Sequence, residues 1–148
     1  GRAFADVQSD VQQLLDAGGG PAVEAVGDEY GYTWLVVRTD PPDVSSLVTD
    51  LHAVNTSLQD SGFGPTLLCS LVSFHDDSGR RVGLVYLYKQ GTFYPFVPST
   101  APGATITGEA PLRRDNLLEI QLRDLLADDL RMEKDTARWF AVWGAPGL

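Results

Sequence analysis

The stretch from Thr66 to Pro98, TLLCSLVSFHDDSGRRVGLVYLYKQGTFYPFVP, contains two runs that predict the central hairpin of the fold. Residues 67–74 and 82–88 are rich in the β-branched and aromatic side chains that strands favour. The DDSG sequence at 76–79 between them is typical of a tight turn. Both alternating sets of side chains are largely apolar, so we expect both faces of the hairpin to be covered over much of their length.

Beyond residue 88 we expect the second strand to run on past Gly91 into an aromatic extension at 93–97, FYPFV. Glycine at this point permits a bulge or a bend. Pro95 has no N–H to donate to a ladder, which places the extension at a sheet edge or beyond pairing.

The flanking segments predict helices and a second hairpin. Apolar residues recur at helical spacing over 4–15 and over 44–58, which predicts two amphipathic helices. Residues 22–27 and 32–38 predict strands joined by a turn at 28–31.

A third helix is predicted from about Asp115 to Leu130, followed by a tryptophan-bearing tail laid against the sheet. The expected apolar side of this helix carries Leu118, Leu122, Leu125 and Leu126. Glu119 and Arg123 stand four residues apart in the favourable order, so we expect them to pair on its polar surface.

The element order α-β-β-α-β-β-α predicts a single α+β domain over residues 1–148. We expect an antiparallel sheet of about four to five strands with helices packed on it. This order resembles the type III secretion chaperone-like architecture. Residues 99–112 are small, contain Pro and Gly and show no clear period, so they are expected to form a loop-like insertion.

Composition excludes several classes of partner. The net charge is −9, from 20 acidic and 11 basic residues, which argues against nucleic acid and against an anionic membrane surface. No stretch approaches the roughly 20 apolar residues that span a bilayer, so direct membrane insertion is not expected. A single cysteine fits a reducing compartment, and we expect a cytoplasmic protein.

No catalytic or metal-binding pattern is found in the chain. Cys69 and His75 lie six residues apart, which is roughly 20 Å along an extended strand, too far for a nucleophile and its base. Metal binding needs three or four convergent ligands, and the chain has two His and one Cys. We therefore expect no catalytic residue, no metal and no cofactor.

Large aromatic residues allow two interpretations. They could close the core, or some of them could form an exposed patch for a protein partner, because Trp and Tyr are favoured interface anchors. The candidate partner-binding residues are Lys89, Phe93, Tyr94, Phe96, Trp139, Phe140 and Trp143.

Several segments resemble the PspA-associated protein PspAB family. They are AFADVQ at 3–8, YGYTWLV at 30–36, LHAVN at 51–55, YLYK at 86–89, GTFYPF at 91–96, RRDN at 113–116 and RWF at 138–140. The resemblance covers residues 4–148, and GTFYPF is its most specific part. Members of that family carry an additional N-terminal segment, so we expect a native segment before Gly1.

The resemblance implies a context. Such proteins accompany phage-shock, or envelope-stress, systems in actinobacteria and some other prokaryotes. They are thought to work beside PspA, a coiled-coil membrane-remodelling protein, and their genes often neighbour a membrane metalloprotease of the HtpX type. No catalytic residues come with the family.

Together these observations predict a non-enzymatic adaptor or chaperone-like module of a PspA-type envelope-stress response. Its expected partner is a PspA-like coiled coil or an HtpX-type membrane protease, which would hold it at the inner face of the membrane. A homodimer paired through hairpin edges or helix faces is compatible with this. The alternative is a small-ligand-binding or hydrolytic domain with its pocket between the sheet and the C-terminal aromatic residues.

Overall fold

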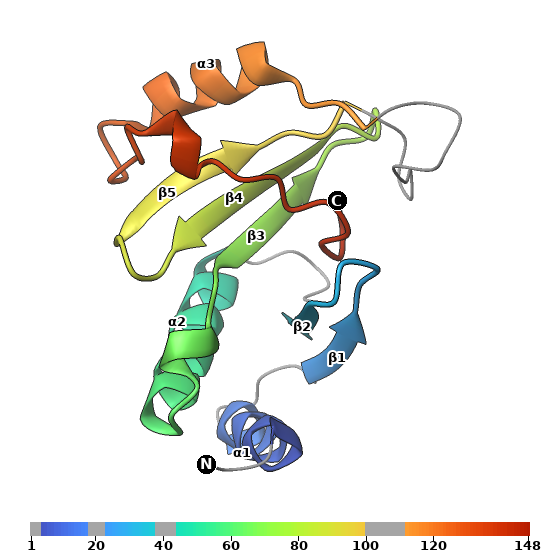
Figure 1. The fold of residues 1–148 in the computed structure, drawn as a ribbon, viewed down its shortest axis with the longest axis vertical. Coiled ribbons are helices and arrows are strands. Elements are labelled where there is room, and N and C mark those ends of the chain that lie inside the picture. The colour runs from blue at the N-terminus through green and yellow to red at the C-terminus, as the bar shows by residue number, and fades with distance from the viewer. Residues whose placement is uncertain (1–3, 18–22, 38–43, 100–111) are drawn as a thin grey trace. The chain divides into compact units, whose positions relative to one another are not determined.

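The computed structural model describes residues 4–17, 23–37, 44–99 and 112–148, which contain helices and antiparallel strands (Figure 1). The predicted α+β class is confirmed. The chain divides into two compact units, Gly1–Leu68 and Cys69–Leu148, and each is described by itself. The prediction of a single domain stays a prediction. None of the described helices is long and apolar enough to cross a membrane.

The first unit contains two helices and a hairpin, as its periodicity predicts. Its elements are α1 (Phe4–Ala17), β1 (Val23–Gly27), β2 (Thr33–Val37), α2 (Val44–Asp60) and a 3-10 helix, η1 (Gly64–Thr66). The strands pair antiparallel, with Val23 opposite Val37 and Gly27 opposite Thr33. Buried Val11 of α1 packs with Val54 and Leu58 of α2, because the apolar faces of the two helices meet.

The turn between β1 and β2 is organised by Asp28. One carboxylate oxygen accepts hydrogen bonds from the N–H groups of Tyr30 and Tyr32, each at 2.9 Å. The other accepts a bond from Trp34 Nε1 at 2.8 Å. Partial burial opposes ionisation, but these bonds prevail and lower the pKa of Asp28. The turn is therefore fixed by one side chain.

The second unit is built on a three-stranded antiparallel sheet in the order β3-β4-β5. Its elements are β3 (Ser70–His75), β4 (Arg81–Leu87), β5 (Thr92–Phe96), α3 (Asn116–Leu126) and a 3-10 helix, η2 (Thr136–Arg138). The predicted hairpin of β3 and β4 is confirmed, with Ser70 opposite Tyr86 and His75 opposite Arg81. In its turn, Asp76 Oδ1 accepts bonds from Ser78 and Arg80 N–H, each at 3.0 Å.

The aromatic extension differs from its prediction. It does not continue β4: the chain reverses at Gly91, whose φ of +69° suits glycine, and returns as β5. Val85 of β4 lies opposite Tyr94 of β5. The predicted element order therefore lacked β5, and the described strands divide between two sheets of two and three strands instead of forming one. The resemblance to the chaperone-like architecture stays a prediction.

The predicted edge position of the extension is confirmed, and the outer edge of β5 is satisfied by later parts of the chain. Phe93 N–H donates to the Arg131 carbonyl at 2.9 Å, and Glu133 N–H donates to the Phe93 carbonyl at 2.7 Å. Pro95 has the same parity as Phe93, so its missing N–H falls on this outer side and costs no ladder bond. Val97 N–H donates to the Glu119 carboxylate at 2.9 Å.

Helix α3 begins after the N-cap Asp115, which accepts a bond from Leu118 N–H at 3.0 Å, and it ends at Leu126. The expected pairing of Glu119 with Arg123 is wrong: Glu119 is 2% exposed and pairs with Arg114, while Arg123 pairs with its neighbour Asp124. Leu125, expected on the apolar side, is also misplaced, because it is 72% exposed. The expected insertion at 99–112 lies, for residues 100–111, outside the described residues.

Candidate partner-binding site

The C-terminal segment crosses one face of the three-stranded sheet (Figure 1). A Cβ on Gly83 of β4 would lie 2.7 Å from Leu148 Cδ1, and a Cβ on Gly147 would lie 2.7 Å from Ser73 Oγ of β3. The segment therefore contacts the central strand and the far strand as well as β5.

An aromatic cluster forms where this segment meets β5. Because side chains alternate along a strand, Tyr94 and Phe96 share one face of the sheet. The Tyr94 ring stacks on Trp139, with centroids 6.0 Å apart, and meets Phe140 edge-on at 5.8 Å. The Phe96 ring meets Trp143 edge-on at 4.8 Å. These five residues, the aromatic cluster, come from two segments more than forty positions apart.

The inner members of the aromatic cluster are core residues of this unit. Tyr94 and Phe96 are fully buried, and Trp139 is nearly so. Their polar atoms are satisfied: Tyr94 O–H donates to the Phe140 carbonyl at 2.8 Å, and Trp139 Nε1 donates to the Glu133 carbonyl at 3.0 Å. Burial raises the pKa of Tyr94, which keeps its hydroxyl protonated as the donor.

The remaining predicted partner-binding residues are exposed or half-buried, and they do not share one face. Phe140 is 44% exposed, and Trp143, three residues later, is half-buried. Lys89 is exposed in the turn between β4 and β5. Phe93 points to the opposite face from Tyr94, where its ring lies 4.8 Å from that of Tyr86. Their contact with a partner stays a prediction.

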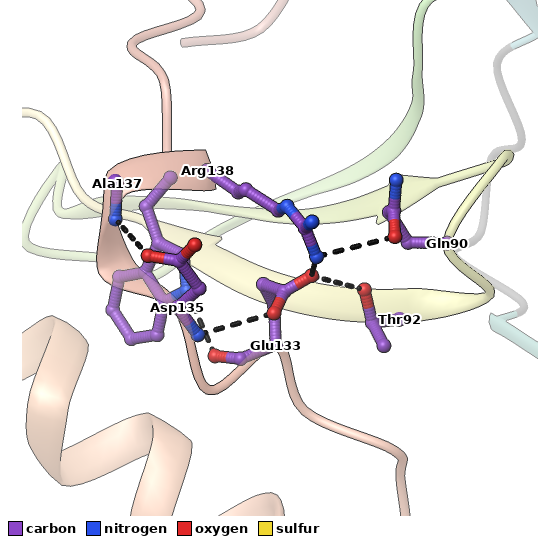
Figure 2. Close-up of polar contacts among 7 residues, drawn as sticks. Gln90, Thr92, Glu133, Asp135, Ala137 and Arg138 are labelled. Atoms are coloured by element: carbon purple, nitrogen blue, oxygen red, sulfur yellow. Dashed lines mark hydrogen bonds and ion pairs between the residues drawn. The ribbon is translucent and has the colours of Figure 1, made fainter.

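A buried carboxylate anchors the start of the C-terminal segment (Figure 2). Glu133 Oε1 accepts bonds from Thr92 Oγ1 at 3.0 Å and from Arg138 Nη1 at 3.4 Å, and its Oε2 accepts a bond from Asp135 N–H at 3.1 Å. Arg138 Nη1 also donates to Gln90 Oε1 at 3.2 Å. The pKa of Glu133 is lowered, chiefly by the hydrogen bond from Asp135 N–H. Burial opposes this shift, and the bonds from Thr92 and Arg138 add to it. We call these residues the Glu133 network.

A second charged group joins α3, β5 and the C-terminal segment. Arg114 Nε donates to Glu119 at 2.9 Å, and its Nη1 donates to the Trp139 carbonyl at 2.6 Å. Its guanidinium lies 4.8 Å from the centroid of the Phe96 ring, close enough for a cation–π interaction. Within the described part of the chain, its Nη2 is buried without a hydrogen-bond partner.

Cys69 and His75 do not form a nucleophile–base pair in this structure. Burial raises the pKa of the Cys69 thiol to about 11, which keeps it protonated at neutral pH. His75 is exposed at the other end of β3. In the ranges that the structure describes, no three His, Cys, Asp or Glu side chains are grouped to hold a metal ion. The described surface of this unit carries the exposed Phe140 ring and the exposed Lys89.

The residues that fix this surface were missed at the level of sequence. Glu133 and Arg138 are five residues apart, which matches no helix or strand period, so their pairing gives no periodic signal. The sequence signal for these residues was instead their position in the segments that carry the family resemblance. The segments 91–96, 113–116 and 138–140 supply Thr92, Arg114 and Arg138, and the structure brings all three segments together in one unit.

A family model, PspAB, described as PspA associated protein B, matches residues 1–147 of the 148-residue chain. The resemblance drawn from the sequence segments is thereby confirmed. No curated protein matches the chain, and no solved structure matches it.

Proposed function

Because this chain belongs to the PspAB family, PspA associated protein B, we propose that it is a non-enzymatic adaptor or chaperone-like protein-binding module. It acts in a PspA-type envelope-stress response. The family description, which indicates an association with PspA, is the observation that carries this proposal. The geometry adds a surface suited to such an association.

The proposed contact surface centres on Phe140 and Trp143, with Lys89 at its border. The main chain at Phe140 is held because its carbonyl accepts the Tyr94 hydroxyl, and its exposed ring packs edge-on against the Tyr94 ring at 5.8 Å. Arg138, two residues earlier, is tied to Gln90, the neighbour of Lys89. A rigid aromatic side chain loses little conformational entropy on binding, which is why such residues anchor interfaces.

We propose PspA as the first partner and an HtpX-type membrane protease as the second. Through either one, the protein would lie at the cytoplasmic face of the membrane. The net charge of −9 weighs against direct adsorption to an anionic bilayer, so a protein contact explains such a position better. The ligand-binding or hydrolytic alternative is weaker, because Tyr94 and Trp139 are buried and stacked where its pocket was expected.

The test is the affinity of the full chain for purified PspA, measured by biolayer interferometry. Replacing Phe140 with Ala removes the exposed ring and leaves its carbonyl, so we expect affinity to fall about tenfold or more. The matched control is Phe74→Ala, since Phe74 is 38% exposed on β3, on the sheet face away from Tyr94. If the two variants lose affinity equally, or if neither loses affinity, the proposal that PspA binds at Phe140 is contradicted.

A further inference from the structure

The two edges of the three-stranded sheet differ in how the chain covers them. At the outer edge of β5, Phe93 is bonded through both its N–H and its carbonyl to the 131–133 segment. Val97 N–H is bonded to the Glu119 carboxylate. Pro95, which lies between them, has no N–H to satisfy. Later parts of the chain therefore cover this edge, whereas the opposite edge is formed by β3 (Figure 1).

The register of the hairpin shows which main-chain groups of β3 face outward. Asp76 N–H donates to the Arg80 carbonyl at 3.1 Å, so these two residues occupy a hydrogen-bonded position. Along an antiparallel ladder, bonded pairs alternate with non-bonded pairs. The next residue, His75, therefore turns its main-chain groups away from β4, and Leu71 and Ser73 have the same parity. Their N–H and carbonyl groups face outward along roughly 13 Å of strand.

We call Leu71, Ser73 and His75 the β3 edge, and it lacks the features that usually protect an edge strand. In the part of the chain that the structure describes, no main-chain hydrogen bond reaches these residues from outside the hairpin. Proteins protect such edges with proline, lysine, a bulge or a covering segment. The β3 sequence, SLVSFH, contains no Pro, Gly, Lys or acidic residue, and its pairing with β4 is unbroken. An edge of this kind is suited to accept an added strand.

We propose that the β3 edge is a docking site for an extended segment of another protein, which adds a fourth strand to this sheet. The main-chain groups select this kind of occupant. Each of the three residues offers one donor and one acceptor at a spacing of two residues, which is the repeat of a β-strand. A helix does not match it, because its main-chain groups bond internally.

The side chains beside the β3 edge restrict the sequence of the docked segment. Because side chains alternate along a strand, Ser73 lies on one face of the sheet and Val72 on the other. Both are half-buried, and β3 carries no Asp, Glu, Lys or Arg. We therefore expect an uncharged segment that alternates between apolar residues beside Val72 and small polar residues beside Ser73. This inference is independent of the proposed PspA association.

NMR titration of the isotope-labelled full chain with a synthetic peptide tests the docking site. The probe is acetyl-STVTVTVTS-amide with N-methyl groups along one edge, which leaves it one free edge and prevents it from forming fibres. We expect the probe to shift the amide resonances of Leu71, Ser73 and His75 and to leave that of Phe93, on the covered edge, unchanged. The same peptide methylated at every nitrogen has no donor, so it should cause none of these shifts.

A proline at Ser73 tests the same site from the side of the protein. Ser73 N–H faces away from β4, so Ser73→Pro removes no ladder bond and reproduces the position of Pro95 on the other edge. We expect the affinity for the probe to fall about tenfold or more, with little change in the circular dichroism spectrum. Ser73→Ala keeps the N–H and is the control that should retain the affinity. If Ser73→Pro does not fold, His75→Pro removes the next outward N–H.

Any of the following results would overturn the proposal. A probe that shifts no resonance at about 1 mM would show that the edge does not accept a strand. Equal binding of the two peptides, or of the proline variant and the wild type, would mean that main-chain hydrogen bonds do not hold the probe. A concentration-dependent dimer in sedimentation that Ser73→Pro abolishes would assign the β3 edge to a second copy of this chain instead.

Discussion

The two units of this chain are held by different kinds of contact. In the first, the core is aliphatic, with Val11, Val54 and Leu58 buried together. Its side-chain hydrogen bonds include that between Asp28 and Trp34, six residues apart, and that between Gln12 and Val23, eleven residues apart. The second unit also has short-range bonds, but three of its side-chain bonds join residues 41 to 48 positions apart: Thr92 with Glu133, Tyr94 with Phe140, and Gln90 with Arg138.

This difference shows which parts of the fold local sequence patterns specify and which depend on contacts distant in sequence. Helical and strand periods suffice for an aliphatic core, because each element needs only an apolar face to bury. The C-terminal segment of the second unit has neither period. Its position depends on buried polar groups. Each of these groups needs a hydrogen-bond partner, because burial removes its water and an unpaired group is not compensated for that loss.

The largest effect is expected where a buried charge loses its partner. Glu119→Ala leaves the Arg114 guanidinium partly buried and unpaired, and it strands the Val97 N–H. We expect the free energy of unfolding to fall by about 3 kcal/mol. Urea denaturation measures this, and Asp124→Ala is the control, since its ion pair with Arg123 is exposed and should contribute under about 1 kcal/mol. Similar values for the two variants would contradict the role of the buried pair.

In the first unit a comparable loss should require an apolar deletion. Leu58→Ala removes most of a buried side chain from the core and should cost about 2–3 kcal/mol in the same assay. If the account of two kinds of core is right, this loss should be insensitive to salt and to pH. A marked dependence of this loss on either would mean that charged groups contribute to the Leu58 core as well.

A smaller effect is expected at the turn of the first hairpin. Asp28→Ala removes the acceptor for Tyr30, Tyr32 and Trp34, whose indole N–H is partly buried. We expect a loss of about 1–2 kcal/mol. Asp28→Asn keeps one acceptor oxygen and should recover part of this. Equal stability of wild type and Asp28→Ala, measured by thermal unfolding, would show that the strands alone fix the turn.

The smallest effect is a pH dependence of the Glu133 network. The folded-state pKa of Glu133 is lowered, so its contribution is fully present above the ordinary glutamate value of 4.5 and is lost as pH falls through the folded pKa. We expect acid unfolding to begin below about pH 4.5. In Glu133→Gln this part of the pH dependence should be missing. An unchanged acid transition in that variant would assign the transition to other carboxylates.

Much of the fold follows from the sequence alone. Both hairpins, their turns and α2 were predicted because period and turn chemistry agree locally. The reversal of the chain at Gly91 was not predicted, since glycine permits a bulge as readily as a turn. The choice is made by contacts distant in sequence: Tyr94 and Phe96 pack with the C-terminal segment, Phe93 N–H donates to the Arg131 carbonyl, and Glu133 N–H donates to the Phe93 carbonyl.

Side-chain placement at the candidate site was harder to predict for the same reason. In α3 the choice between Glu119 and Leu125 for the inner face depends on Arg114 and on the Val97 N–H, which helical spacing does not reveal. Trp139 and Phe140 are adjacent in a segment without a long helix or a strand, so no period indicates which one is buried. Only the long-range contacts of Trp139 decide it.

Hydrogen–deuterium exchange of the full chain with and without purified PspA tests the central claim most directly. If the chain is an adaptor that binds through the second unit, PspA should slow exchange at residues 138–148 and 88–92, and leave the Asp28 turn unchanged. Protection confined to the first unit, or no protection at saturating PspA, would contradict the account.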